Sequence, residues 1–146
     1  MRVLIDANVI LDLVGKRSPF YISASKTILL SAEKKIEGFI TSNTVTDIYY
    51  IACRHYTNES DARDIIQKLL RIVGVLDVGY KDCIKAFDLL MQDYEDALLS
   101  VCAYRAKCDY IVTRDIDHFS NSLVKAITPD DFISKHFPDY NNSEED

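Results

Sequence analysis

The chain alternates short apolar runs with longer stretches in which apolar residues recur at helical spacing. The short runs favour strands over residues 2–5, 38–41, 73–78, 109–113 and 123–128. The longer stretches predict helices over residues 20–36, 44–56, 59–72, 81–91 and 94–107. Strands that alternate with helices are typical of a parallel sheet covered by helices, so the pattern predicts an α/β domain.

Length and composition support one globular domain. The 146 residues are 48% hydrophobic and 27% charged, which excludes a disordered chain and a membrane span. We expect the domain to occupy residues 1–134 and an acidic, flexible tail to occupy residues 135–146. The four cysteines lack the paired spacing of a zinc or redox motif, and the start of the chain lacks the apolar segment of an export signal. We therefore expect a cytoplasmic protein without a membrane partner.

Four carboxylates fall at positions that a parallel sheet brings to one edge. Asp6 directly follows the first predicted strand, and Asp115 follows the fourth. Asp47 and Asp96 lie near the starts of two predicted helices that follow strands or loops on that edge. Because open α/β sheets bind ligands at the carboxyl ends of their strands, we expect these four side chains to converge there.

Convergent carboxylates repel one another unless a cation neutralises them. Mg²⁺ and Mn²⁺ prefer oxygen ligands and pair naturally with phosphates. Such ions can activate a water and orient a phosphodiester, so the pattern predicts metal-dependent hydrolysis.

Most of the four positions also have a simpler interpretation. Asp47 lies three residues after Thr44, and Asp96 three residues after Asp93, so both could complete capping boxes or favour a helix dipole. Asp115 could be a helix N-cap. Asp6 is harder to explain in this way, because it interrupts an apolar run.

Three motifs resemble those of the PIN domain family, the nuclease fold of the VapC-like toxin ribonucleases. LIDANVILDL at residues 4–13 resembles the first motif, in which an Asp and an Asn or Ser follow a strand. DYEDALLSVCA at residues 93–103 resembles the third motif, and TRDIDHF at residues 113–119 resembles the last. Their order and spacing match over residues 1–134.

The resemblance implies a PIN-like three-layer α/β/α sandwich and an endoribonuclease that cleaves single-stranded RNA. It further implies that Asp6, Asp96 and Asp115 bind Mg²⁺ or Mn²⁺. The family's second acid is usually Glu, and Asp47 is the only acid in the corresponding segment here. If the resemblance to toxins holds, an antitoxin protein is an expected partner, and PIN proteins commonly form homodimers.

Several further residues could assist. Asn8 and Thr113 could orient the ligating carboxylates, or could simply stabilise a turn and a strand. Asp93 and Asp117 could hold a second ion or act as exposed helix caps. The net charge of −6 excludes binding of nucleic acid through bulk positive charge, but a local basic rim could hold phosphates. The candidates for that rim are Lys16, Arg17, Arg54 and Arg114.

Two other functions fit parts of the sequence. Asp47 in place of Glu is compatible with a non-catalytic PIN-like module that binds RNA or a protein. An acid after a first strand is also found in haloacid-dehalogenase-like phosphatases, but these need a second Asp where this chain has Asn8.

Overall fold

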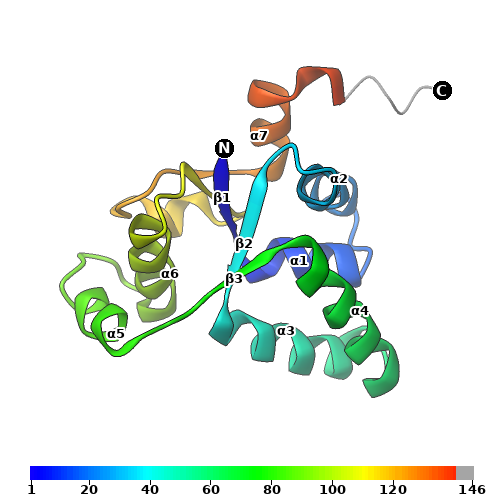
Figure 1. Ribbon diagram of the computed structural model, residues 1–146, viewed down its shortest axis with the longest axis horizontal. Helices are drawn as coiled ribbons and strands as arrows, with labels where there is room; N and C mark the ends of the chain where they lie inside the picture. Colours follow the sequence, from blue (N-terminus) through cyan, green and yellow to red (C-terminus); the bar gives the residue numbers. More distant parts are fainter. Residues whose placement is uncertain (141–146) are drawn as a thin grey trace.

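The fold is built on a parallel sheet of five strands in the order β3-β2-β1-β4-β5 (Figure 1). The computed structural model describes residues 1–140. The strands are β1 (Arg2–Ile5), β2 (Glu37–Thr41), β3 (Gly74–Leu76), β4 (Tyr110–Val112) and β5 (Ala126–Ile127). Every pairing between neighbouring strands is parallel. The predicted parallel sheet is confirmed, and each observed strand falls within or within one residue of its predicted range.

Helices cover both faces of the sheet, which confirms the predicted three-layer sandwich. Figure 1 shows α1 to α4 and α7 on one side of the strands and α5 and α6 on the other. The helices are α1 (Ala7–Val14), α2 (Tyr21–Ala32), α3 (Ser42–His55), α4 (Glu59–Ile72), α5 (Tyr80–Ala86), α6 (Tyr94–Arg105), the 3-10 helix η1 (Ile116–Phe119) and α7 (Pro129–His136).

The side chains of β1 divide between two apolar cores. Val3 and Ile5 belong to the core beneath α1 to α4 and α7. Leu4 points to the opposite face and packs in a second core with Leu99 of α6 and Ile111 of β4. Because side chains alternate along a strand, a central strand buried on both faces reads as a continuous apolar run.

The order of the strands places a topological switch point between β1 and β4. The chain proceeds from β1 outward to β2 and β3, and then crosses back to β4 and β5 on the other side of β1. The crevice at such a point, beyond the carboxyl ends of the strands, is where open α/β sheets bind ligands. The residues that follow β1 and β4 therefore occupy the favoured place for a site.

Two α-helices, α1 and α7, were not predicted from the sequence, nor was the short 3-10 helix η1. α1 spans only eight residues and follows β1 almost directly, so its mostly apolar positions are too few to show a helical period distinct from the apolar run of the strand. α7 does carry starting signals that sequence reasoning overlooked. Thr128 accepts a hydrogen bond from the backbone N of Asp131 at 3.1 Å, and Pro129 occupies the first turn.

The packed chain extends beyond the predicted domain boundary at residue 134. Phe137 and Tyr140 lie against the larger core, and the Tyr140 hydroxyl donates a hydrogen bond to Glu33 at 2.6 Å. The remainder of the predicted tail, residues 141–146, lies outside the described residues. Within residues 1–140, no helix combines the length and hydropathy needed to cross a membrane.

Substitution of Leu4 by Ala should lower the free energy of unfolding by about 2 to 5 kcal/mol, because it leaves a cavity under α6 at a fully buried position. Urea denaturation followed by circular dichroism measures this change. The matched control is Leu90→Ala at a position that is 85% exposed, where we expect a change below about 0.5 kcal/mol. Equal losses in the two variants would contradict the assigned core.

Candidate active site at the carboxyl end of the sheet

Asp6 lies where β1 passes directly into α1. Its backbone N donates to Val112 O at 3.0 Å, which continues the pairing with β4. Its Oδ1 accepts a hydrogen bond of 2.7 Å from the backbone N of Ala7, at the start of α1. Burial raises the pKa of Asp6, against the opposing effect of hydrogen bonds from Thr113 and Ala7. A half-buried carboxylate is thus held at the switch point of the sheet.

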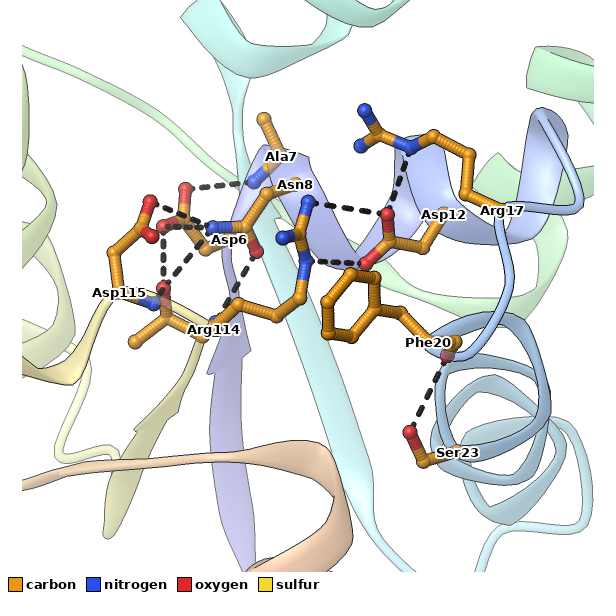
Figure 2. A network of polar contacts seen from close by, with 10 residues as sticks. Asp6, Ala7, Asn8, Asp12, Arg17, Phe20, Ser23, Arg114 and Asp115 are labelled. Carbon is orange, nitrogen blue, oxygen red and sulfur yellow. Dashed lines mark hydrogen bonds and ion pairs between the residues drawn. The ribbon is translucent and has the colours of Figure 1, made fainter.

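Neutral hydrogen-bond donors join Asp6 to Asp115 (Figure 2). The Thr113 hydroxyl donates to Asp6 Oδ2 at 2.8 Å and accepts from the backbone N of Asp115 at 3.0 Å. Asn8 Nδ2 donates to Asp115 Oδ2 at 3.1 Å and lies 3.5 Å from Asp6 Oδ2. The structure therefore brings both predicted assistants, Asn8 and Thr113, into contact with the two strand-end acids.

Asp115 precedes η1, but its side chain makes no capping hydrogen bond. The alternative interpretation of Asp115 as an N-cap is therefore wrong for its carboxylate. The carboxylate instead accepts from Asn8, which leaves it part of the acidic cluster.

Asp96 enters the cluster from the first turn of α6. Asp93 is the N-cap of this helix and accepts from the backbone N of Asp96 at 3.0 Å, so its capping interpretation is confirmed. Burial, followed by the charges of Asp93 and Asp6, raises the pKa of Asp96 to about 6. His118 Nδ1 lies 3.6 Å from Asp96 Oδ2 and opposes this rise when protonated.

Asp47 sits deeper in its helix than the sequence predicted. α3 begins at Ser42 rather than at residue 44, and its first turn contains no acid. The capping interpretation of Asp47 is therefore wrong. Thr44 instead shares a hydrogen bond of 2.7 Å with the hydroxyl of Thr41, the last residue of β2. Asp47 is left half-buried in the second turn of α3.

Glu95 faces Asp47 and was not among the predicted site residues. Burial raises the pKa of Glu95 to about 7, and a hydrogen bond and charge repulsion from Asp47 add to the rise. The charges of Asp93 and Asp6 contribute as well. The run DYED at residues 93–96 held a signal, because its three acids span one helical turn. α3 and α6 thus bring two carboxyl groups together, and Glu95 holds its proton more tightly than a free glutamic acid does.

Asp117 lies apart from the direct contacts of the cluster. It is exposed in the first turn of η1 and lines a cavity of about 460 Å³ together with Asp93 and His118. The prediction that Asp93 and Asp117 hold a second ion stays a prediction.

Two of the predicted RNA-binding arginines are engaged within the protein. Arg114 Nε and Nη2 donate to the two oxygens of Asp12 at 2.6 and 3.2 Å. Arg17 Nε lies 2.8 Å from Asp12 Oδ1. Asp12 itself is only 1% exposed and was not recognised from the sequence, because a buried acid in an apolar segment reveals its partners only in the folded chain. Arg54 is exposed in the last turn of α3 and forms no ion pair with any residue among 1–140, and Lys16 is exposed after α1.

The donor chemistry of the cluster suits a hard divalent cation. The cluster offers carboxylate oxygens as ligands, from Asp6, Asp96, Asp115, Asp47 and Glu95. The mutual repulsion of these carboxylates is relieved by a positive charge. Across residues 1–140, no three His, Cys, Asp or Glu side chains already stand close enough to hold a metal ion.

Comparisons with known proteins agree with this architecture. The PIN domain family matches residues 2–117. Ribonuclease VapC1 from Aquifex aeolicus (strain VF5) is 23% identical over 139 residues, which cover 92% of this chain and 94% of that protein. A structure of VapBC2 from Rickettsia felis bound to a DNA fragment from their promoter aligns with a TM-score of 0.67 at 16% identity, over 88% of this chain and 98% of that one. Mycobacterium tuberculosis VapC20, a sarcin-ricin loop cleaving toxin, aligns with a TM-score of 0.64 at 14% identity, over 80% and 92% of the two chains.

The metal-free protein should lose stability as the pH rises from about 5 to about 8, because the folded state binds protons at Glu95 and Asp96 more tightly than the unfolded state does. Urea denaturation in the presence of EDTA measures the free energy of unfolding at each pH. Glu95→Gln should flatten this dependence. The matched control Glu59→Gln, at an exposed position on α4, should leave it unchanged, and an equal dependence in all three proteins would contradict the raised pKa of Glu95.

Proposed function

Because the chain belongs to the PIN domain family, we propose that it is a metal-dependent endoribonuclease that hydrolyses phosphodiester bonds of single-stranded RNA. The observation that carries the proposal is the gathering of carboxylates from β1, α3, α6 and the end of β4 at the switch point of the sheet. Similarity to a protein named as a ribonuclease, over 92% of the chain, supports the same activity.

We place Mg²⁺ or Mn²⁺ between Asp6, Asp96 and Asp115, with the Asp47 and Glu95 pair beside them. Such an ion would supply a nucleophilic water at neutral pH and neutralise charge on the phosphate. The short side chain of Asp47 replaces the usual Glu of the family, and Glu95 brings a longer carboxyl group to the same place. Together, Asp47 and Glu95 would provide the carboxylate that a single Glu usually provides at this position in the family.

The protein's own groups orient this centre. Thr113 donates to Asp6 and Asn8 donates to Asp115, so each acid is oriented and still has oxygen lone pairs that could bind a cation. Because Asn8 and Thr113 are neutral, they fix the carboxylates without cancelling the negative charge that attracts the cation. This charge also repels free phosphate, which makes substrate binding dependent on the cation.

RNA binding then combines phosphate held at the cation with local basic contacts. Arg54 is the most available of the three predicted arginines, because Arg17 and Arg114 are paired with Asp12. We propose that Arg54 contacts the RNA backbone. A role of Arg17 and Arg114 in contacting RNA stays a prediction.

We further propose that the chain is the toxin of a toxin-antitoxin pair and binds an antitoxin protein. The proposal rests on fold similarity to the toxin VapC20 and to the VapBC2 structure. Homodimer formation stays a prediction. A non-catalytic PIN-like module is the second candidate function, because Asp47 stands where the family usually has Glu. Glu95 argues against this candidate, since it adds a carboxyl group beside Asp47.

Asp6→Asn and Asp96→Asn should each lower kcat/KM for Mn²⁺-dependent cleavage of a fluorescent single-stranded RNA by about 100-fold or more, since each removes a charged ligand. The matched control is Asp64→Asn at an exposed position on α4, which should cleave at the wild-type rate. Wild-type protein that binds this RNA but never cleaves it would favour the non-catalytic module. Cleavage that survives both site substitutions would contradict the assigned centre.

Asp47→Asn and Glu95→Gln should each reduce cleavage by about 10 to 100-fold if the two carboxyl groups act as a pair. The double variant should lose little more than the worse single variant, because residues that act as a unit are not additive. Steady-state cleavage assays on the four proteins measure this coupling, with Glu59→Gln as the matched control. Full activity of Glu95→Gln would show that Asp47 acts alone.

A further inference from the structure

A buried carboxylate beside the candidate active site holds the residue that lies between Thr113 and Asp115. Asp12 of α1 is 1% exposed, and Arg114 grips both of its oxygens with a two-pronged contact at 2.6 and 3.2 Å. Arg17 approaches the same carboxylate from the segment after α1, at 2.8 Å. Figure 2 shows Asp12 between the two guanidinium groups, with the Asp6 and Asp115 network on the other side of Arg114.

From this geometry we propose that Asp12 and Arg114 are positioning residues, which hold the end of β4 against α1 and thereby set the position of Asp115 relative to Asp6. The inference rests on the proposed ribonuclease function and deepens it. Neither residue is required to touch RNA or a metal ion. Their effect passes through the main chain of residues 113–115.

The first argument is that α1 holds the end of β4 at two points. Asn8 and Asp12 are four residues apart on α1, so their side chains lie on the same face of the helix. Asn8 Oδ1 accepts from the backbone N of Arg114 at 3.4 Å, while Asp12 binds its guanidinium group. Arg114 is thus fixed at both its backbone and its side chain, and rotation of this segment away from α1 breaks both contacts.

The second argument is that Arg114 also contacts an aromatic ring. Its guanidinium carbon lies 4.1 Å from the centre of the Phe20 ring, at the start of α2. A guanidinium group is planar, so contact with an aromatic ring and a two-pronged contact with a carboxylate together fix its orientation. A lysine ammonium group cannot reproduce this orientation. Arg114 therefore links the end of β4 to α1 and to the start of α2 in a fixed geometry.

The third argument concerns charge. Two arginines lie against one buried carboxylate, and a charge-assisted bidentate contact of this kind is among the stronger hydrogen-bonded pairs in proteins. Arg17 is in turn placed by the Tyr56 ring, whose centre lies 5.5 Å from its guanidinium carbon. Asp12 is too deeply buried to touch a substrate, so any effect of its replacement on cleavage must pass through its partners.

The test compares Asp12→Asn and Arg114→Lys with the double variant. Arg114→Lys keeps the positive charge but loses the two-pronged contact with Asp12. Its effect therefore reports the loss of that contact and not the loss of a charge. We expect each substitution to lower kcat for RNA cleavage about 10 to 100-fold with KM changed less than about 3-fold, and the double variant to lose little more than either. The matched control Arg63→Lys, on the exposed face of α4, should leave kcat and KM unchanged.

A second readout does not depend on cleavage. The backbone N–H of Asp115 donates to Thr113 Oγ1, and its hydrogen exchange in metal-free protein reports whether the segment is held. Exchange measured by NMR should be at least about 10-fold faster in Arg114→Lys than in wild type or Arg63→Lys. Circular dichroism at the assay temperature shows whether Asp12→Asn is folded, and if it is not, Arg114→Lys decides the question alone.

Two results would overturn the proposal. A higher KM with unchanged kcat in Arg114→Lys, together with normal cleavage by folded Asp12→Asn, would show that Arg114 contacts RNA directly. Unchanged hydrogen exchange of the Asp115 amide in Arg114→Lys would show that the Arg114 side chain does not hold residues 113–115 in place. If wild-type protein cleaves no RNA, the proposed function fails, while the exchange measurement still decides whether Asp12 and Arg114 position Asp115.

Discussion

Carboxylates that lie near one another repel, and the active-site end of this sheet gathers them from four separate parts of the chain. The charges of Asp6, Asp96 and Asp115 act on one another at the switch point, and Glu95 lies against Asp47 beside them. Burial and mutual charge raise the pKa of Asp96 to about 6 and that of Glu95 to about 7. Two apolar cores, one on each face of the sheet, supply the folding free energy that keeps this unfavourable cluster together.

The protein treats its buried acids in two different ways. Asp12 is paired with two arginines, so its charge is compensated within the protein. Among residues 1–140, the groups that donate hydrogen bonds to Asp6 are the neutral ones of Ala7, Thr113 and Asn8, which orient the carboxylate and leave its charge in place. The first arrangement neutralises the carboxylate, and the second leaves the negative charge that the proposed cation site requires. The partners, rather than the residue type, decide which role an aspartate takes.

Much of the fold could be predicted from local pattern. The five strands were found because short apolar runs between longer helical patterns mark buried parallel strands. α1 escaped prediction because it is short and mostly apolar and follows β1 almost directly, so its helical period does not stand out from the apolar run of the strand. Asp6 and Asp115 could be placed at one edge of the sheet because each lies shortly after the end of a strand, and parallel topology brings these strand ends to the same edge.

The sequence by itself determined that acids follow two parallel strands at one edge of the sheet, with Asn8 and Thr113 two residues away from them along the chain. That these two strands, β1 and β4, are neighbours was decided by the fold. Tertiary structure alone decided that Glu95 faces Asp47 and that Arg17 and Arg114 meet at Asp12. Arg114 and Asp12 are separated by 102 positions along the chain. Periodicity shows which face of an element is apolar, but the pairing of polar side chains depends on how distant elements pack against one another.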